Sequence, residues 1–189
     1  MLTAKKQKVG LWLAIAAVFS ATALLLRAEG RLWMCACGKV LAWSGGVCSA
    51  ENSQQFLDPY SFTHLLHGVL FFWLIYWLAP KWNLTMQLLL ATAVEAAWEI
   101  LENTNFIIER YRTATAALGY NGDTVVNSLG DLLCCSAGFL IAQRLGLRRS
   151  LLLFAAVELV LIVWIHDSLL LEILMLITPI NAIKAWQMC

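Results

Sequence analysis

The amino-acid sequence predicts an all-α protein, a bundle of five or six transmembrane helices that forms a single integral membrane domain over residues 1–189. Hydrophobic residues make up 61% of the chain and charged residues only 13%. Soluble domains are typically about 45–50% apolar and about 25% charged. The mean hydropathy of +0.73 points the same way. Nine tryptophans, several of them near the ends of apolar segments, suit the interfaces of a bilayer.

Apolar segments of roughly 17–25 residues are long enough to cross a bilayer as helices. Five such segments predict spans at residues 9–27, 62–80, 84–102, 123–143 and 150–166. The first is longer than the apolar region of a typical signal peptide and is expected to stay as an uncleaved anchor. A sixth stretch, residues 168–186, is interrupted by Glu172, Pro179 and Asn181, so that it spans, re-enters or lies at the interface. The longest loop, at about 28–61, is expected on the outer side.

Basic residues in short loops predict the orientation, because they favour the cytoplasmic side. Three regions that must share one side carry most of these charges: Lys5, Lys6, Lys8, Lys81, Arg144, Arg148 and Arg149. We therefore expect a cytoplasmic N-terminus, with the start of the second span, the end of the third and the start of the fourth on the outer side. The net charge of +1 gives no reason to expect a nucleic-acid partner.

Three polar residues open the fourth predicted span at intervals of four. Asp123, Asn127 and Asp131 would stack on one face of a helix, next to a segment that is otherwise almost wholly apolar. Ionisable groups at membrane depth are costly and usually line a cavity or a pathway. The spacing therefore predicts one wall of a site, with these residues as catalytic candidates.

The third predicted span carries Glu95, Glu99 and Glu102 on one helical face, beside Trp98. The intramembrane position favours a functional role. The structural alternative is strongest for Glu95, which would then hold helices together through hydrogen bonds.

The second predicted span begins with two histidines three residues apart, His64 and His67, which can face one site. Together with a carboxylate such as Glu99 they would suit a divalent metal such as zinc, manganese or iron as cofactor. The alternative chemistry needs no metal, because two carboxylates such as Asp131 and Glu102 can divide the acid and base roles.

The loop after the third span holds groups that bind anions or lipid headgroups. Arg110 and Arg112, with Asn103, are candidates for substrate binding. The structural alternative is that the arginines pair with Glu109 or Asp123 and only order the loop.

Three cysteines lie in the predicted outer loop, where disulfides persist. Because Cys35 and Cys37 are awkwardly close to bridge each other, we expect Cys48 to pair with one of them, with soft-metal binding as the alternative. Elsewhere, His166 and Asp167 at the outer end of the fifth span are positioned to join the site. Glu158, in the middle of that span, is expected to hydrogen-bond to a neighbouring helix.

The order of these motifs resembles an uncharacterised family of bacterial, mainly proteobacterial, inner-membrane proteins that is carried as a domain of unknown function. The motifs are Cys-x-Cys-Gly at 35–38, Glu-Asn-Ser-Gln at 51–54, Ser-x-x-His-x-x-His-Gly at 61–68, Trp-Glu-x-x-Glu-Asn at 98–103, Phe-Ile-Ile-x-Arg-Tyr-Arg at 106–112 and Gly-Asp-x-x-x-Asn-Ser-x-x-Asp at 122–131. The resemblance covers nearly the whole chain and implies a multi-pass plasma-membrane protein, without an activity. Residues 123–138 also resemble the acidic helix of VanZ-like membrane proteins, and the two aspartates faintly resemble those of lipoprotein signal peptidases.

Three functions follow from this pattern. The first is an enzyme of the outer leaflet that acts on a membrane lipid or a lipid-linked substrate, with carboxylates as acid and base or with histidines as metal ligands. The second is the binding or transport of a metal or small ion, with Glu95 and Glu158 extending the path inward. The third is an accessory protein whose polar residues only lock the helices together. A continuous polar route would favour transport, whereas a site closed on the cytoplasmic side would favour catalysis.

Overall fold

A computed structural model describes residues 2–117 and 119–188, and within residues 2–8 it describes the backbone only. The lysines at positions 5, 6 and 8, which the predicted orientation uses, therefore have their side chains outside the described part. The described chain is helical and contains no strand. Its helices are α1 (Leu2–Ala28), α2 (Ser61–Leu78), α3 (Leu84–Glu102), α4 (Asn105–Ala114), α5 (Val125–Leu145), α6 (Leu147–Ile165), α7 (Leu169–Ile177) and α8 (Asn181–Gln187).

Four of these helices are long and apolar enough to cross a membrane: residues 9–28 of α1, and α2, α3 and α5. A fifth span results if α6 and α7 count as one, although they bend by 72° where they meet. This confirms the predicted helical membrane bundle. Residues 168–186 do not form a straight sixth span, since α7 and α8 have only nine and seven residues and a span needs about 20.

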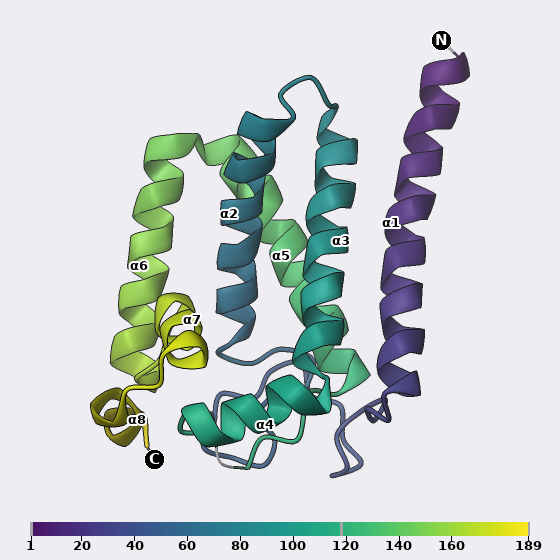
Figure 1. The fold of residues 1–189 in the computed structure, drawn as a ribbon. Coiled ribbons are helices and arrows are strands. Elements are labelled where there is room, and N and C mark those ends of the chain that lie inside the picture. Colours follow the sequence, from purple (N-terminus) through teal and green to yellow (C-terminus); the bar gives the residue numbers. More distant parts are fainter. Residues whose placement is uncertain (1, 118, 189) are drawn as a thin grey trace.

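The polar segments gather at one end of the bundle (Figure 1). There α4 lies across the ends of the long helices, next to the loop of residues 29–60. The α2–α3 turn with Lys81 and the α5–α6 turn with Arg144 and Arg148 lie at the opposite end, as does the N-terminus. The regions that were expected to share a side therefore do so. The assignment of that side to the cytoplasm stays a prediction.

Glycines allow α2 and α5 to pack with their backbones in contact. A Cβ atom on Gly68 would lie 1.9 Å from the carbonyl oxygen of Cys135, and one on Gly138 would lie 2.0 Å from that of Leu65. Small residues permit this close approach in membrane bundles, where packing and not water exclusion drives helix association. The contact fixes the position of α2, which carries the histidines, against α5.

An apolar core fills the half of the bundle near the α2–α3 turn. Its buried members come from four helices: Ile15, Val69, Phe72, Ile75, Leu88, Ala91, Phe139 and Ala142. On α2, α3 and α5 these core residues lie nearer that end than the site residues His64, His67, Glu95, Glu99, Asn127 and Asp131 do. The polar half of the bundle is thus closed off from the other end.

The short helix α7 is held by polar groups at both ends. At its start, Glu158 of α6 accepts hydrogen bonds from the backbone amides of Leu169 (3.0 Å) and Leu170 (3.3 Å). At its end, Arg110 of α4 donates to the carbonyl oxygens of Leu176 (2.8 Å) and Ile177 (3.2 Å). These are the backbone groups that a helix leaves unsatisfied, and the charges match the helix dipole. The predicted role of Glu158 in joining helices is confirmed.

Replacing Arg110 with alanine is expected to loosen α7 without unfolding the bundle. Two hydrogen bonds from a charged donor would be lost, a local cost of about 2 kcal/mol. Hydrogen exchange of the α7 amides should therefore speed up, while exchange in α2 and α5 stays unchanged. Arg148→Ala, at an exposed position of α6, is the matched control. Unchanged protection of α7 in Arg110→Ala would show that its packing alone holds this helix.

The predicted pairing of the loop cysteines is wrong. Cys35 bonds to Cys37, and Cys48 is disulfide-bonded as well, but to neither of these two. The turn after Cys35, in which the Gly38 amide donates to the Cys35 carbonyl oxygen (3.0 Å), brings the two Cα atoms to 5.1 Å. That separation suits a disulfide, and spacing in sequence alone did not reveal the turn.

Candidate functional site

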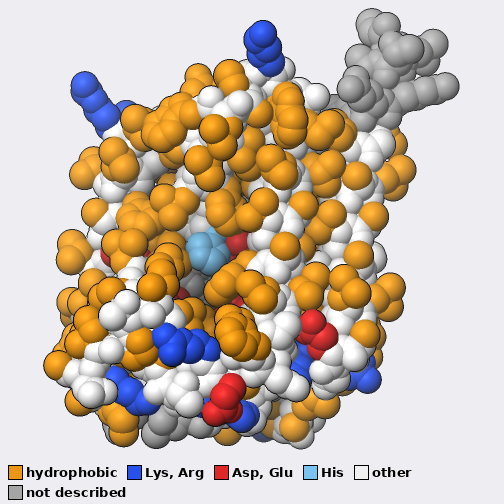
Figure 2. All heavy atoms as spheres, in the orientation of Figure 1, with side chains coloured by type: hydrophobic (Ala, Val, Ile, Leu, Met, Phe, Trp, Pro, Cys, Tyr) orange, Lys and Arg blue, Asp and Glu red, His pale blue; other side chains and the backbone are white. Residues whose placement is uncertain are grey.

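A cavity of 430 Å³ lies in the polar half of the bundle, between α2, α3, α4, α5 and the α6–α7 corner. Figure 2 shows it as a hollow with a histidine at its base, above α4 and framed by hydrophobic side chains. Its polar lining comes from segments far apart in the sequence: Asn52, Ser53, Asp58, Tyr60, Thr63, His64, His67, Glu102, Tyr111, Thr115, Tyr120, Asp123, Asn127, Asp131, Asp167, Glu172 and Gln187. Most of the candidate residues that the sequence singled out lie here.

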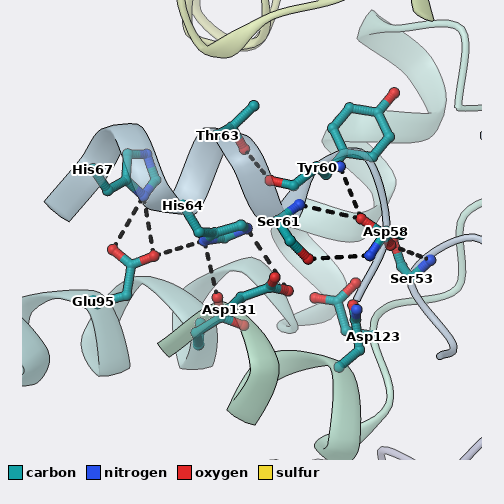
Figure 3. Close-up of polar contacts among 12 residues, drawn as sticks. Ser53, Asp58, Tyr60, Ser61, Thr63, His64, His67, Glu95, Asp123 and Asp131 are labelled. Carbon is teal, nitrogen blue, oxygen red and sulfur yellow. Dashed lines mark hydrogen bonds and ion pairs between the residues drawn. The ribbon is translucent and has the colours of Figure 1, made fainter. Parts of the chain in front are cut away.

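Both histidines of α2 meet one carboxylate of α3 (Figure 3). The Nδ1 atom of His64 lies 2.6 Å from Oε1 of Glu95, and Nδ1 of His67 lies 3.0 Å from Oε2. Their spacing of three places the two rings on the same side of α2, and α3 packs alongside. His64, His67 and Glu95 offer ligand atoms within 4.8 Å of one another, so these residues could hold a metal ion.

A second set shares His64 and continues along α3. His64, Glu99 and Glu102 also offer ligand atoms within 4.8 Å of one another. The Oε1 atom of Glu99 lies 3.2 Å from His64 Nδ1, and Oδ2 of Asp131 lies 3.9 Å from His64 Nε2. The predicted stripe of Glu95, Glu99 and Glu102 therefore faces His64 as one surface. This donor set of imidazole and carboxylate suits zinc, manganese or iron.

Several carboxylate oxygens in this cluster have no hydrogen-bond donor. Both oxygens of Glu99, Oε2 of Glu102 and Oδ1 of Asp131 are buried without a hydrogen-bond partner in the described part of the chain. The nearby His64 Nδ1 has at most one proton, and it lies closer to Glu95. An unpaired buried charge is strongly destabilising. The cluster is therefore incomplete as a purely structural hydrogen-bond network.

The charge of the cavity is unbalanced. Asp58, Glu102, Asp123, Asp131, Asp167 and Glu172 all line it, and no lysine or arginine does so among the residues with described side chains. Among the lining residues that the structure describes, His64 and His67 are the only basic groups. Such a wall attracts cations and repels anions.

Asp123 reaches the cavity from a loop and not from a helix. Because Thr124 caps the N-terminus of α5, with its side chain accepting from the Asn127 amide, Asp123 lies before the helix begins. The predicted helical stripe over Asp123, Asn127 and Asp131 is therefore wrong in its first member, although all three line the cavity. Asp123 accepts hydrogen bonds from Asn103 Nδ2 (2.9 Å) and the Tyr120 hydroxyl (2.9 Å). Burial raises the pKa of Asp123, and these two hydrogen bonds oppose the rise.

Asn103 and Asn127 are engaged within the protein. Asn103 is 1% exposed, does not line the cavity, and accepts from the Asp123 amide at 2.7 Å. Asn127 donates to the carbonyl oxygen of Gln55 at 2.9 Å, which fastens the 29–60 loop to α5. Asn103 thus positions Asp123, and Asn127 positions the loop. The substrate-binding role of Asn103 and the catalytic role of Asn127 stay predictions.

Neither arginine of α4 lines the cavity. Arg110 caps the end of α7, and Arg112 donates to the Tyr120 carbonyl oxygen and to the Asn121 side chain. Arg112 also lies 3.8 Å from Glu109, an exposed pair. The contacts thus resemble the structural alternative, in which the arginines order the loop. Their predicted role in substrate binding is not tested by this geometry.

Several groups of the cavity were not predicted from the sequence. Asp58 accepts hydrogen bonds from the backbone amides of Ser53 (2.8 Å), Tyr60 (2.8 Å) and Ser61 (3.3 Å), and burial raises its pKa against these bonds. Its signal was an Asp-Pro pair just before an apolar helix, which is typical of a helix start. The only signal of Glu172 in the sequence was a charged residue within an otherwise apolar stretch. The expectation that His166 and Asp167 join the site is met for Asp167, which lines the same cavity, and is wrong for His166, which is exposed and does not line it.

Comparison with known proteins gives clear relatives. A family model described as a protein of unknown function, DUF2585, matches residues 26–189. A UPF0314 protein from Sphingopyxis alaskensis is 46% identical over 176 residues, which cover 93% of this chain and 94% of that protein. One from Rhizobium meliloti is 42% identical over 184 residues (97% and 93%), and one from Paracoccus denitrificans is 41% identical over 165 residues (87% and 86%). No solved structure matches the chain. These relatives do not bear on the resemblance to VanZ-like proteins, which stays a prediction.

Proposed function

Because the chain belongs to the DUF2585 family of proteobacterial proteins, as its motifs predicted, and because that family's description names no activity, we infer the function from the cavity. We propose that the protein is a membrane-embedded metalloenzyme, a hydrolase or transferase that acts on a lipid or a lipid-linked substrate. We further propose that it lies in the bacterial inner membrane with a cytoplasmic N-terminus, an orientation supported by the basic residues near the α2–α3 and α5–α6 turns.

The unpartnered carboxylate oxygens around His64 carry this proposal. The buried oxygens of Glu99, Glu102 and Asp131 face an imidazole with at most two N–H donors, of which Nδ1 lies closest to Glu95. A divalent cation would satisfy several of these oxygens at once. Its ligands would come from His64, His67 and Glu95 or from His64, Glu99 and Glu102. When bound, such an ion supplies Lewis-acid activation of a water molecule or of a substrate oxygen.

The remaining groups suit acid–base chemistry. Asp131 or Glu102 would accept the proton of the attacking nucleophile and return it to the leaving group, as paired carboxylates do elsewhere. Asp123, which two hydrogen bonds hold in place, would orient the substrate.

Two features favour catalysis over ion transport. The apolar core around Phe72 and Phe139 closes the cavity toward the α2–α3 turn. Glu158, which would have extended a polar path inward, instead caps α7. These observations support a site with a single opening.

Metal analysis of the detergent-purified, untagged protein tests the proposal. We expect the wild type to retain about one equivalent of a divalent metal per chain and His64→Ala to lose it, because His64 belongs to both ligand sets. His166→Ala is the matched control, since this third histidine is exposed and contacts Trp186, with the two ring centroids 4.8 Å apart. A metal-free wild type would overturn the metalloenzyme. If metal is present, incubation with a bacterial lipid extract follows, and mass spectrometry should find a product with the wild type and none with His64→Ala. An unchanged extract would contradict the enzymatic part and favour metal binding alone.

A further inference from the structure

The cavity opens on the flank of the bundle. Its rim includes one half-exposed apolar side chain from each of three helices: Leu70 of α2 (44% exposed), Val94 of α3 (43%) and Ile173 of α7 (43%). In Figure 2 the hollow is surrounded by hydrophobic side chains that continue over the flank of the bundle. Because α2 and α3 are membrane spans, this rim lies where acyl chains would contact the protein. A molecule with an apolar tail can therefore reach the polar interior from the bilayer.

A second polar group lies on the α6–α7 side of the cavity, apart from the residues around His64. It consists of Asp167, Glu172 and Gln187, all of which line the cavity. The oxygens of Asp167 accept hydrogen bonds from the Ser168 amide at 2.8 Å and from the Tyr60 hydroxyl at 3.4 Å. Since a carboxylate has about four lone-pair sites, acceptor capacity remains.

Gln187 gives an independent sign of a missing ligand. Its side chain is 8% exposed and lines the cavity; its amide nitrogen serves Asp167, yet its amide oxygen has no hydrogen-bond partner within the described chain. Buried amides are nearly always hydrogen-bonded. Two carboxylates and an amide oxygen around a shared space provide three acceptors without a cationic donor.

We propose that the substrate is an amphiphile with a primary ammonium group, whose tail leaves between Leu70, Val94 and Ile173 and whose ammonium group binds Asp167, Glu172 and Gln187. An ammonium group has three donors and no acceptor, which matches this set of acceptors. An anionic headgroup finds no lysine or arginine among the described residues of the cavity wall. The inference deepens the proposed function by naming the class of substrate, but the binding that it describes does not depend on the metal.

Binding of simple single-chain probes tests this inference. Purified protein in a maltoside detergent is titrated with dodecylammonium, dodecanol and dodecyl phosphate, and thermal stability is recorded. We expect dodecylammonium to raise the melting temperature and the other two probes to leave it unchanged. Glu172→Gln should weaken the apparent affinity for dodecylammonium about tenfold, which corresponds to about 1.4 kcal/mol. Glu109→Gln, which changes an exposed carboxylate of α4, is the matched control and should bind as the wild type does.

A bulky substitution at the rim of the cavity gives a second test of dodecylammonium binding. Val94→Trp should weaken dodecylammonium binding, whereas Leu74→Trp, at an exposed position of α2 away from the cavity, should not. If Glu172→Gln does not fold, Gln187→Leu takes its place. Equal or stronger binding of dodecyl phosphate, or undiminished ammonium binding in the cavity variants, would overturn the inference.

Metal content separates this inference from the proposed function. His64→Ala is expected to lose metal but to keep dodecylammonium binding, and Glu172→Gln is expected to do the reverse. A wild type that holds metal but shows no preference for the ammonium probe would refute the substrate class alone. A metal-free wild type that still prefers this probe would refute the metalloenzyme alone.

Discussion

Gly68→Ala is expected to prevent the bundle from forming. The added Cβ atom would lie 1.9 Å from the Cys135 carbonyl oxygen and 2.7 Å from the Phe139 nitrogen, both of them backbone atoms that cannot swing aside. To avoid this clash, α2 and α5 must move apart where their backbones touch. This would destabilise the folded state by about 3 kcal/mol or more. The purified variant should therefore aggregate, or melt well below the wild type, in gel filtration and thermal unfolding.

Gly10→Ala is the matched control for this substitution. Gly10 also lies in a helix, but an added Cβ atom there meets nothing within 4 Å. Alanine is the better helix former by about 0.5–1 kcal/mol, so this variant should be as stable as the wild type or slightly more so. A Gly68→Ala protein with wild-type stability would mean that α2 and α5 are not in backbone contact. The α2–α5 contact could then not be what fixes the position of the histidines.

Because Glu99 belongs to the ligand set of His64, Glu99 and Glu102, Glu99→Leu tests that set: it is expected to stabilise the metal-free protein and to remove the response to metal. Glu99 is fully buried, and neither of its oxygens has a hydrogen-bond partner in the described chain. Leucine has a similar volume and no polar atoms. The substitution therefore removes the desolvation penalty of a buried carboxyl group that no hydrogen bond offsets, about 1–3 kcal/mol. In EDTA the variant should melt at a higher temperature than the wild type.

Adding metal should reverse that order. A ligand present at a thousand times its dissociation constant stabilises the folded state by about 4 kcal/mol. Zinc or manganese should therefore raise the melting temperature of the wild type and change that of Glu99→Leu little. Glu109→Leu, at an exposed site, should show the full wild-type response. A Glu99→Leu protein that is less stable than the wild type in EDTA, with an undiminished metal response, would assign Glu99 to the scaffold.

The long helices and the carboxylate surface of α3 could be predicted because both follow from local periodicity. A run of about 20 apolar residues needs a helix in a bilayer, whatever its neighbours are. The predicted span at 84–102 matches α3 in both bounds. Glu95 and Glu99 lie on one side of that helix by geometry alone, and so do His64 and His67 on α2.

The roles of polar residues near helix ends could not be predicted in the same way. Asp123 continued the spacing of Asn127 and Asp131, but Thr124 ends the helix before it. Arg110 looked like a ligand for an anion, yet its partners are carbonyl oxygens of α7, 66 and 67 residues farther along the chain. A residue type shows which bonds a side chain can make, whereas the partner depends on which segments the fold brings together.

The membrane class, the spanning segments and the helix faces that carry the histidines and the carboxylates were thus already present in the order of the residues. They depend on hydrophobicity and on helical repeat, which act over a few turns. The opening on the flank, the carboxylate-rich wall and the split between hydrogen-bonded and unpartnered carboxylates arise only when α2, α3, α5 and α7 pack together. The physical reason is that burial and hydrogen bonding depend on neighbours in space. Here those neighbours, such as His64 and Asp131 or Tyr60 and Asp167, lie far apart along the chain.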